Sequence, residues 1–319
     1  TADGKFVVLE SESQETNGVS LIDIDASSVD FGVVAMSDDD DDDAEPEPKA
    51  FRSLTHAAPR AMVPRRRGHR YYPEHRRGRW FILSNRDGKI NFDLYRTAVS
   101  SEDVEGDVDV GEASWEHVPA SVMSSATSSV ASSNDGLTPT IPTTPTTAGF
   151  GWSAGRTLES ISAFSDFLLV EGREDGFSQV WVLSLDAAGA IAKTKRTEWP
   201  AKNRCVYTAT ASASLSCVGA NQVFETHEAF LAYSSLNCPR TTYAYDMRDD
   251  TKAVVKRTPV LGFDEAEYAA ARMEIEVRDG VKVPVSLAWK RRTRQSTDKT
   301  NAPPRDAPVL LTGYGSYGV

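Results

Sequence analysis

The sequence is poor in the residues that stabilise small extracellular domains. Its 319 residues include only three cysteines, Cys205, Cys217 and Cys238, which form no C-x-x-C pair, and no N-x-[ST] sequon occurs. A disulfide framework is therefore not expected, and a reducing, cytosolic location is favoured. We expect the cysteines to be small buried thiols rather than catalytic nucleophiles.

Long apolar runs are also missing. No stretch approaches the roughly 18 apolar residues of a membrane helix, and the first residues lack the basic-then-apolar pattern of a secretory signal. The composition, 40% apolar and 25% charged, is typical of a soluble globular protein with one large or two ordinary domains. We therefore expect a cytoplasmic protein with no membrane partner.

Only five histidines occur, and they suggest neither a metal site nor a catalytic triad. His69 and His75 lack further Cys or His partners at zinc spacing. The acidic stretch 103–112 resembles a calcium loop only in composition, because its sixth position is Val108 instead of glycine. No serine lies on a G-x-S-x-G elbow from which a Ser/His/Asp triad could be assembled. We expect no cofactor and no metal.

Charge is concentrated in two short segments. The net charge is −11, but the aspartate run 38–43 with Glu45 and Glu47 contributes eight of the negative charges. The basic stretch "RRRGHRYYPEHRRGRW", residues 65–80, contains seven arginines. A phosphate-binding patch is one interpretation of that stretch, but a solvated strand and loop is the favoured one. We therefore expect no nucleic-acid partner.

Alternating apolar and polar residues indicate β-hairpins throughout the chain. Four segments share this plan: "DGKFVVLESESQETNGVSLIDID", "RGRWFILSNRDGKINFDLYRTAV", "SDFLLVEGREDGFSQVWVLSLD" and "HEAFLAYSSLNCPRTTYAYDM". Each has β-branched and aromatic residues around a Gly, Asn or Asp turn. The only helical signal is weak, about two turns at 264–271.

The uneven spacing of these hairpins is largely explained by two polar insertions. One is the acidic segment 37–50, and the other is the Ser/Thr/Pro-rich segment 121–149, extended to about 157. Neither can bury enough apolar surface to order itself, so both are predicted to be disordered. Without them the repeat falls near the roughly 40–50 residues of a propeller blade.

The character of the chain changes after Gly262. The segment "MEIEVRDGVKVPVSLAWKRR" reads as one more hairpin about an "RDG" turn, and a polar linker then leads to the apolar strand "PVLLTGYG". A polar linker before a buried strand indicates entry into a second domain. We therefore divide the chain into a propeller portion, 1–262, and the start of another domain, 263–319.

The closing "PVLLTGYGSYGV" is compatible with three kinds of chemistry. Gly313, Gly315 and Gly318 have dinucleotide-loop spacing, but no helix or acidic residue follows. Ser316 as an elbow nucleophile would require glycine where Tyr314 stands. A glycine-rich loop that supports an oxyanion remains possible beside a purely structural turn.

The ordered motifs resemble the prolyl oligopeptidase family of serine peptidases, and within it the oligopeptidase B branch. "HRRGRWFILSNRDGKINFDLYRTAV", "FSDFLLVEGREDGFSQVWVL", "YSSLNCPRTTYAYDM", "PVLGFDEAEY", "VRDGVKVPVSLAWK" and "PVLLTGYGSYGV" occur in that family's order and approximate spacing. The resemblance covers the chain apart from the two insertions. It implies a mainly β fold: about four blades of a seven-bladed β-propeller, then the first strands of an α/β-hydrolase domain.

The resemblance also implies an activity and site residues. The family cleaves short peptides, here after Arg or Lys, and its propeller keeps folded proteins out of the catalytic cavity. Tyr314 matches the family's oxyanion tyrosine, and Tyr317 matches an aromatic residue of the specificity pocket. The segment 274–287, "EIEVRDGVKVPVSL", matches the hairpin that joins the propeller to the hydrolase core. The nucleophile, the other triad members and the acidic specificity residues lie beyond residue 319 in the family.

Two hypotheses follow from the sequence. The favoured one is a fragment of a serine oligopeptidase that is inactive by itself, because removal of triad members costs several orders of magnitude in rate. The alternative is a non-catalytic β-propeller that serves as an interaction module. The sequence carries no signal for an oligomeric state.

Overall fold

The computed structural model describes residues 1–24, 59–97, 110–118, 155–200, 205–211, 221–291, 303 and 306–313. Within these ranges the protein consists of β-strands and three short 3-10 turns, with no α-helix. The two predicted insertions, 37–50 and 121–157, lie outside the described residues except for 155–157. In the described part, no helix is both long and apolar enough to cross a membrane.

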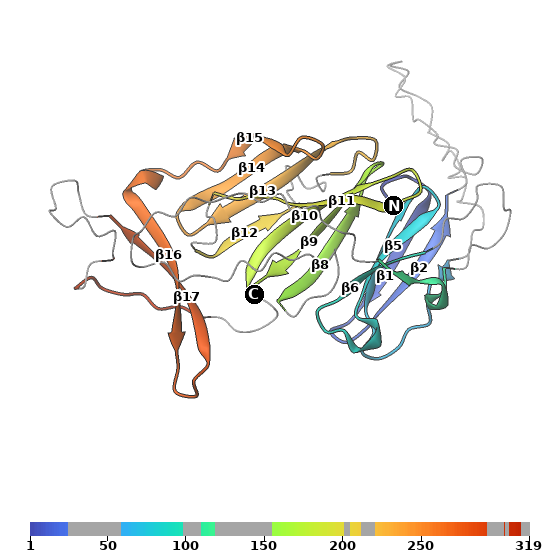
Figure 1. The fold of residues 1–319 in the computed structure, drawn as a ribbon, viewed down its shortest axis with the longest axis horizontal. Coiled ribbons are helices and arrows are strands. Elements are labelled where there is room, and N and C mark those ends of the chain that lie inside the picture. Colours follow the sequence, from blue (N-terminus) through green and yellow to red (C-terminus); the bar gives the residue numbers. More distant parts are fainter. Residues whose placement is uncertain are drawn as a thin grey trace, which may run out of the picture.

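Four antiparallel sheets follow one another along the chain (Figure 1). The first two contain β1 (Phe6–Glu12), β2 (Asn17–Asp23) and β3 (Arg60–Ala61), then β4 (Tyr71–Arg76), β5 (Arg79–Ser84), β6 (Asp93–Arg96) and β7 (Glu116–His117). The third contains β8 (Arg156–Ala163), β9 (Phe167–Glu174), β10 (Phe177–Leu185) and β11 (Ile191–Arg196). The fourth contains β12 (Tyr207–Thr210), β13 (Glu228–Ser235), β14 (Cys238–Asp246) and β15 (Thr251–Arg257).

The four predicted hairpins are confirmed as neighbouring antiparallel strands. They form the pairs β1–β2, β5–β6, β9–β10 and β13–β14, each within one sheet. The turn between β9 and β10 shows why the local sequence is enough to specify such a hairpin. Asp175 and Gly176 both have positive φ, 52° and 76°, as a two-residue hairpin turn requires.

The second and third sheets each bury their two faces against different neighbours, because successive side chains of a strand point to opposite sides. On β5, Trp80 and Ile82 join the cluster shared with β2, whereas Phe81 and Leu83 join the cluster shared with β8, β9 and β10. A third cluster joins the sheet of β8–β11 to that of β12–β15. This face-to-face stacking of consecutive antiparallel sheets, three of them four-stranded, is the arrangement of propeller blades.

A separate hairpin follows the last sheet (Figure 1). It consists of β16 (Tyr268–Glu276) and β17 (Lys282–Lys290), which pair along their full lengths from Tyr268↔Lys290 to Glu276↔Lys282. The turn includes Gly280 at φ 78°. The hairpin predicted about the "RDG" turn is therefore confirmed.

Two local predictions after Gly262 are wrong. The expected helical turns at 264–271 reduce to one 3-10 turn, Glu265–Glu267, because β16 begins at Tyr268 and its alanines pair with β17. Residues 308–313 form no strand, and Val309, Leu310 and Leu311 are exposed. In the described part no neighbouring strand offers them backbone hydrogen bonds, and an apolar run alone does not make a strand.

Candidate functional site

The residues predicted to carry chemistry, Tyr314 and Tyr317, lie outside the described part of the chain, as does Ser316, which the sequence disfavours as a nucleophile. Beside them, a Cβ added to Gly313 would meet no atom of the described residues within 4 Å. The oxyanion and pocket roles of the tyrosines therefore stay predictions.

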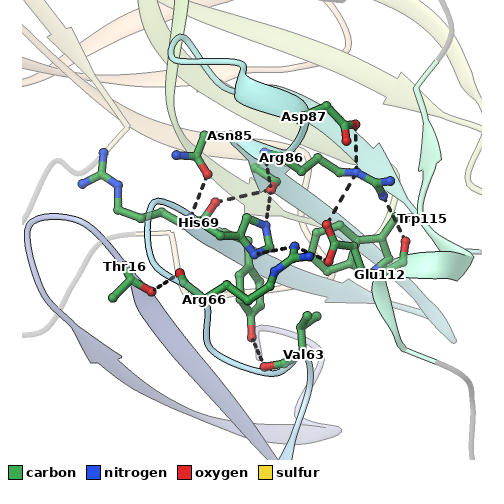
Figure 2. Close-up of polar contacts among 12 residues, drawn as sticks. Thr16, Val63, Arg66, His69, Asn85, Arg86, Asp87, Glu112 and Trp115 are labelled. Carbon is green, nitrogen blue, oxygen red and sulfur yellow. Dashed lines mark hydrogen bonds and ion pairs between the residues drawn. The ribbon is translucent and has the colours of Figure 1, made fainter.

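The structure gathers another set of polar groups between the first two sheets (Figure 2). His69 and Arg66 come from the loop before β4, Ser84 ends β5, Arg86 lies in the 3-10 turn after it, and Glu112 opens the turn before β7. Arg66 and Arg86 both pair with the Glu112 carboxylate, and Figure 2 shows them converging on it. Segments more than 40 residues apart thus meet at one point.

His69 and Ser84 have the spacing of a nucleophile and its base. The Nε2 of His69 lies 3.0 Å from the Oγ of Ser84, and both residues are buried. The Nδ1 of His69, however, lies 3.2 Å from a guanidinium nitrogen of Arg66. Because arginine can only donate, Nδ1 must accept, and the proton of neutral His69 is on Nε2. His69 therefore donates to Ser84 and cannot take its proton.

Ser84 has its full complement of hydrogen bonds. Its Oγ accepts from His69 and from the backbone N–H of Arg86 at 3.1 Å, and it donates to the carbonyl of Arg70 at 3.3 Å. Burial, followed by the charges of the neighbouring Arg66 and Arg86, lowers the pKa of His69, although Glu112 acts in the opposite direction. A neutral imidazole and a fully bonded, inaccessible serine make this a structural polar core rather than a catalytic dyad.

His75 is also held by a buried hydrogen-bond partner. Its Nδ1 lies 2.6 Å from a carboxylate oxygen of Asp3, and both side chains are almost fully buried. Burial by itself raises the pKa of Asp3, but the hydrogen bond and charge of His75, with a bond from the Thr1 hydroxyl, lower it to about 2. The pair ties the segment before β1 to β4.

Six of the seven arginines of the basic stretch 65–80 contact carboxylates, carbonyls or hydroxyl groups of the protein. Arg67 pairs with Glu15 at 2.7 Å, and Arg77 approaches Glu225 at 3.4 Å. Arg76 is buried and donates to the carbonyls of Ser165 and Asp186 in the next sheet. These guanidinium groups face carboxylates and carbonyls, which favours the structural interpretation over a phosphate-binding patch.

The two described thiols are also structural. Cys205 and Cys238 are free and buried, and burial raises the pKa of each thiol. A raised pKa disfavours the reactive thiolate, so the prediction of inert buried thiols is confirmed for these two. Cys217 lies outside the described residues.

None of these groups carried a usable sequence signal. Ser84 and His69 are 15 residues apart, and Glu112 contacts Arg66 across 46 residues. Within the described residues no group of three or more His, Cys, Asp or Glu side chains could hold a metal ion.

Two cavities lie beside the linker after β15. The larger has a volume of about 480 Å³ and is lined by exposed residues such as Arg257, Val260 and Asp264.

Comparison with known proteins defines the class of the repeated sheets. Residues 153–258 match the family described as "Prolyl oligopeptidase, N-terminal beta-propeller domain". That range contains all of β8–β11 and β12–β15, which are two complete four-stranded blades. This region is therefore similar to the N-terminal β-propeller domain of prolyl oligopeptidases.

Individual relatives extend the similarity beyond that range. "Protease 2" from Moraxella lacunata is 30% identical over 164 residues, 51% of this chain and 20% of that protein. "Dipeptidyl aminopeptidase BI" from Pseudoxanthomonas mexicana is 24% identical over 261 residues, 81% of this chain and 27% of that protein. The chain is thus similar to two proteins named as peptidases, and it spans about a fifth to a quarter of their length.

Solved structures share the fold at lower identity. Oligopeptidase B from Trypanosoma brucei, in a closed form with covalently bound antipain, matches with a TM-score of 0.59 at 21% identity over 94% of this chain. Oligopeptidase B from Leishmania major gives the same TM-score over 91% of this chain. The chain spans about a third of each of these structures, 32% and 31% respectively.

Proposed function

We propose that this chain belongs to a serine oligopeptidase that cleaves short peptides after Arg or Lys. The observation that carries the proposal is the family match over residues 153–258, because it coincides with two complete blades. The fold shared with oligopeptidase B along nearly the whole chain supports the finer assignment. In the proposed enzyme, residues 1–262 belong to a seven-bladed propeller and residues 263–319 begin an α/β-hydrolase domain.

One face of the β16–β17 hairpin is apolar and largely exposed, which supports the proposal of a further domain packed against it. Met273, Ile275, Val283 and Val285 belong to one face, because Met273 pairs with Val285 and Ile275 with Val283. Three of these side chains are among the exposed large apolar residues. A two-stranded hairpin is only marginally stable alone, so an apolar face of this kind requires a cover. The cover we propose is the sheet of the catalytic domain.

Within this proposal Tyr314 stabilises negative charge on the reacting carbonyl oxygen. A phenol hydroxyl suits that role because it is neutral at pH 7 and donates one hydrogen bond. Tyr317 lines the pocket that accepts the basic side chain. The nucleophilic serine, its histidine and its aspartate come from outside these 319 residues.

The test uses the product of the complete reading frame that contains this sequence. Fluorogenic peptides that end in Arg, Lys, Pro or Ala before the reporter are compared, and a serine-directed fluorophosphonate identifies the nucleophile. We expect hydrolysis after Arg and Lys at least about tenfold faster than after Pro or Ala. We also expect labelling of one serine, whose substitution by alanine abolishes both signals.

Two results would contradict the proposal in different ways. Faster cleavage after Pro would refute the basic specificity but keep the peptidase. Absence of both hydrolysis and serine labelling in a folded protein would refute the enzyme, and would favour the non-catalytic propeller module.

A further inference from the structure

The hairpin β16–β17 is held to the propeller by its polar face. Arg272 pairs with Ser286 across the hairpin, on the face opposite to Met273 and Val285. Both side chains reach outside the hairpin. Arg272 contacts the β9–β10 turn, and the Oγ of Ser286 accepts a hydrogen bond of 3.2 Å from the backbone N–H of Val206.

The Arg272 contact is specific in its geometry. Its guanidinium carbon lies 4.1 Å from the centroid of the Phe177 ring, and Nη2 donates to the carbonyl of Asp175 at 3.4 Å. A cation placed over an aromatic face is attracted by the ring quadrupole, and the carbonyl adds direction. Phe177 is itself buried in the core between the last two blades, so it is a rigid platform.

Gly176 makes room for this contact. It has φ 76°, and a Cβ placed there would lie 3.1 Å from Nη2 of Arg272. The residue that allows the tight turn therefore also allows the guanidinium to approach. At the β9–β10 turn, the Phe177 ring, the Asp175 carbonyl and the space beside Gly176 together form the binding site for the Arg272 guanidinium.

The two anchors connect the hairpin to two different blades. Arg272 is bound by the turn of the β8–β11 blade, whereas Ser286 is bound by the residue that precedes β12. Because Arg272 and Ser286 form one residue pair, both anchors lie at the middle of the hairpin. The part between them and the hairpin turn is exposed: Ile275 is 44% and Val281 is 54% accessible.

We propose, on the basis of the peptidase function above, that Arg272 is a positioning residue that sets how the propeller presents the catalytic domain. The clasp, formed by Arg272 and Ser286 with their partners, fastens the middle of the hairpin to the propeller. Because the sheet of the proposed catalytic domain covers the other face of the hairpin, the clasp fixes that domain relative to the blades. Loss of the clasp frees the hairpin and lowers the population of the catalytically competent arrangement.

Hydrogen exchange of the complete protein tests the clasp without reference to activity. In Arg272→Ala, amides of β16 and β17 should exchange about tenfold faster, whereas those of β9 and β10 should keep their protection. Arg272→Lys, which retains the cation over Phe177, should lie between Arg272→Ala and the wild type. Arg278→Ala, in the exposed hairpin turn, is the matched control and should not differ from wild type. Unchanged protection of the hairpin in Arg272→Ala would overturn the proposal.

Steady-state kinetics test the consequence for catalysis. A smaller competent population weakens apparent substrate binding, so Arg272→Ala should raise KM about three- to tenfold, with kcat within about twofold of wild type. Arg272→Lys should recover part of the loss, and Arg278→Ala should show none. A fall in kcat at constant KM, or no kinetic change despite faster exchange, would refute the positioning role. If the protein hydrolyses no peptide, the peptidase function fails, while the exchange result still decides whether the clasp exists.

Discussion

The Nε2 of His69 lies 3.0 Å from the Oγ of Ser84, yet the proton between them belongs to the imidazole. Arg66, on the other side of the ring, can only donate, and this determines the tautomer. Two residues with the spacing of a catalytic dyad thus serve as hydrogen-bonded core. Which atom carries the proton, rather than the distance between the two atoms, distinguishes this structural hydrogen bond from a catalytic dyad.

Substitution of Ser84 tests this structural role. Ser84→Ala leaves two buried donors, the His69 Nε2–H and the Arg86 N–H, without an acceptor. We expect a loss of about 1–3 kcal/mol in the free energy of unfolding, measured by urea denaturation. Ser20→Ala on β2 is the control and should change stability by less than about 0.5 kcal/mol. A loss of peptidase activity without a loss of stability would contradict the assignment.

The Asp3–His75 pair predicts an acid-dependent contribution to stability. The pKa of Asp3 in the folded protein, about 2, lies below its ordinary value of 3.8. Ionised Asp3 therefore stabilises the fold above about pH 4, and most of the contribution of about 2 kcal/mol is lost as the pH falls from about 4 through about 2.

The measurement compares unfolding free energies of wild type and Asp3→Asn from pH 6 to pH 2. The difference should shrink to near zero across the lower part of that range, because the protonated carboxyl no longer differs in charge from the amide. Asp23→Asn, at the exposed end of β2, is the control for replacement of a carboxylate by an amide at the surface. A constant difference for Asp3→Asn would show that the pair is not responsible.

Gly172 on β9 is required by close packing of two backbones. A Cβ at this position would lie 2.1 Å from the carbonyl oxygen of Thr157 on β8. Gly172→Ala should therefore destabilise the protein by about 3 kcal/mol in thermal unfolding. Gly18→Ala on β2 is the matched control, because its Cβ would meet only the Arg65 side chain at 3.6 Å. Equal stability of the two variants would contradict the close approach of β8 and β9.

Tyr314 provides the direct test of the proposed oxyanion site. In the product of the complete reading frame, Tyr314→Phe should lower kcat on an arginyl peptide by about ten- to a thousandfold, because one donor to the developing charge is lost. KM should change little, and Tyr268→Phe on the hairpin should retain wild-type kinetics. An unchanged kcat in Tyr314→Phe would remove the assigned role.

Local sequence patterns predicted the hairpins of the sheets correctly, but they misassigned two short segments after Gly262. The alternation in β9 and β10, with Asp175 and Gly176 between them, specifies a hairpin through residues that are adjacent in sequence. The alanines 269–271 favour helix by propensity, but pairing with β17 places them in β16. The apolar run at 309–311 predicted a strand because the pattern cannot tell whether a neighbouring strand is present.

The site residues expected from the sequence, Tyr314 and Tyr317, rest on the resemblance of the terminal loop and stay predictions. The contacts of His69 with Ser84 and of Arg272 with Asp175 join residues 15 and 97 positions apart, which no spacing in the sequence indicates. Arg66 is only three residues from His69, but its effect on the tautomer depends on how the folded loop directs its guanidinium group.

The sequence alone determined the repeated hairpins, their turns and the peptidase-family resemblance, because these depend on neighbouring residues and on side-chain alternation. Tertiary structure alone decided what the polar residues do. It placed a guanidinium beside the imidazole of His69, which turned a possible base into a donor. It also stacked Arg272 on Phe177, which made a hairpin residue an anchor on the propeller. Such roles arise from the direction of hydrogen bonds and from burial, which exist only after distant segments have packed together.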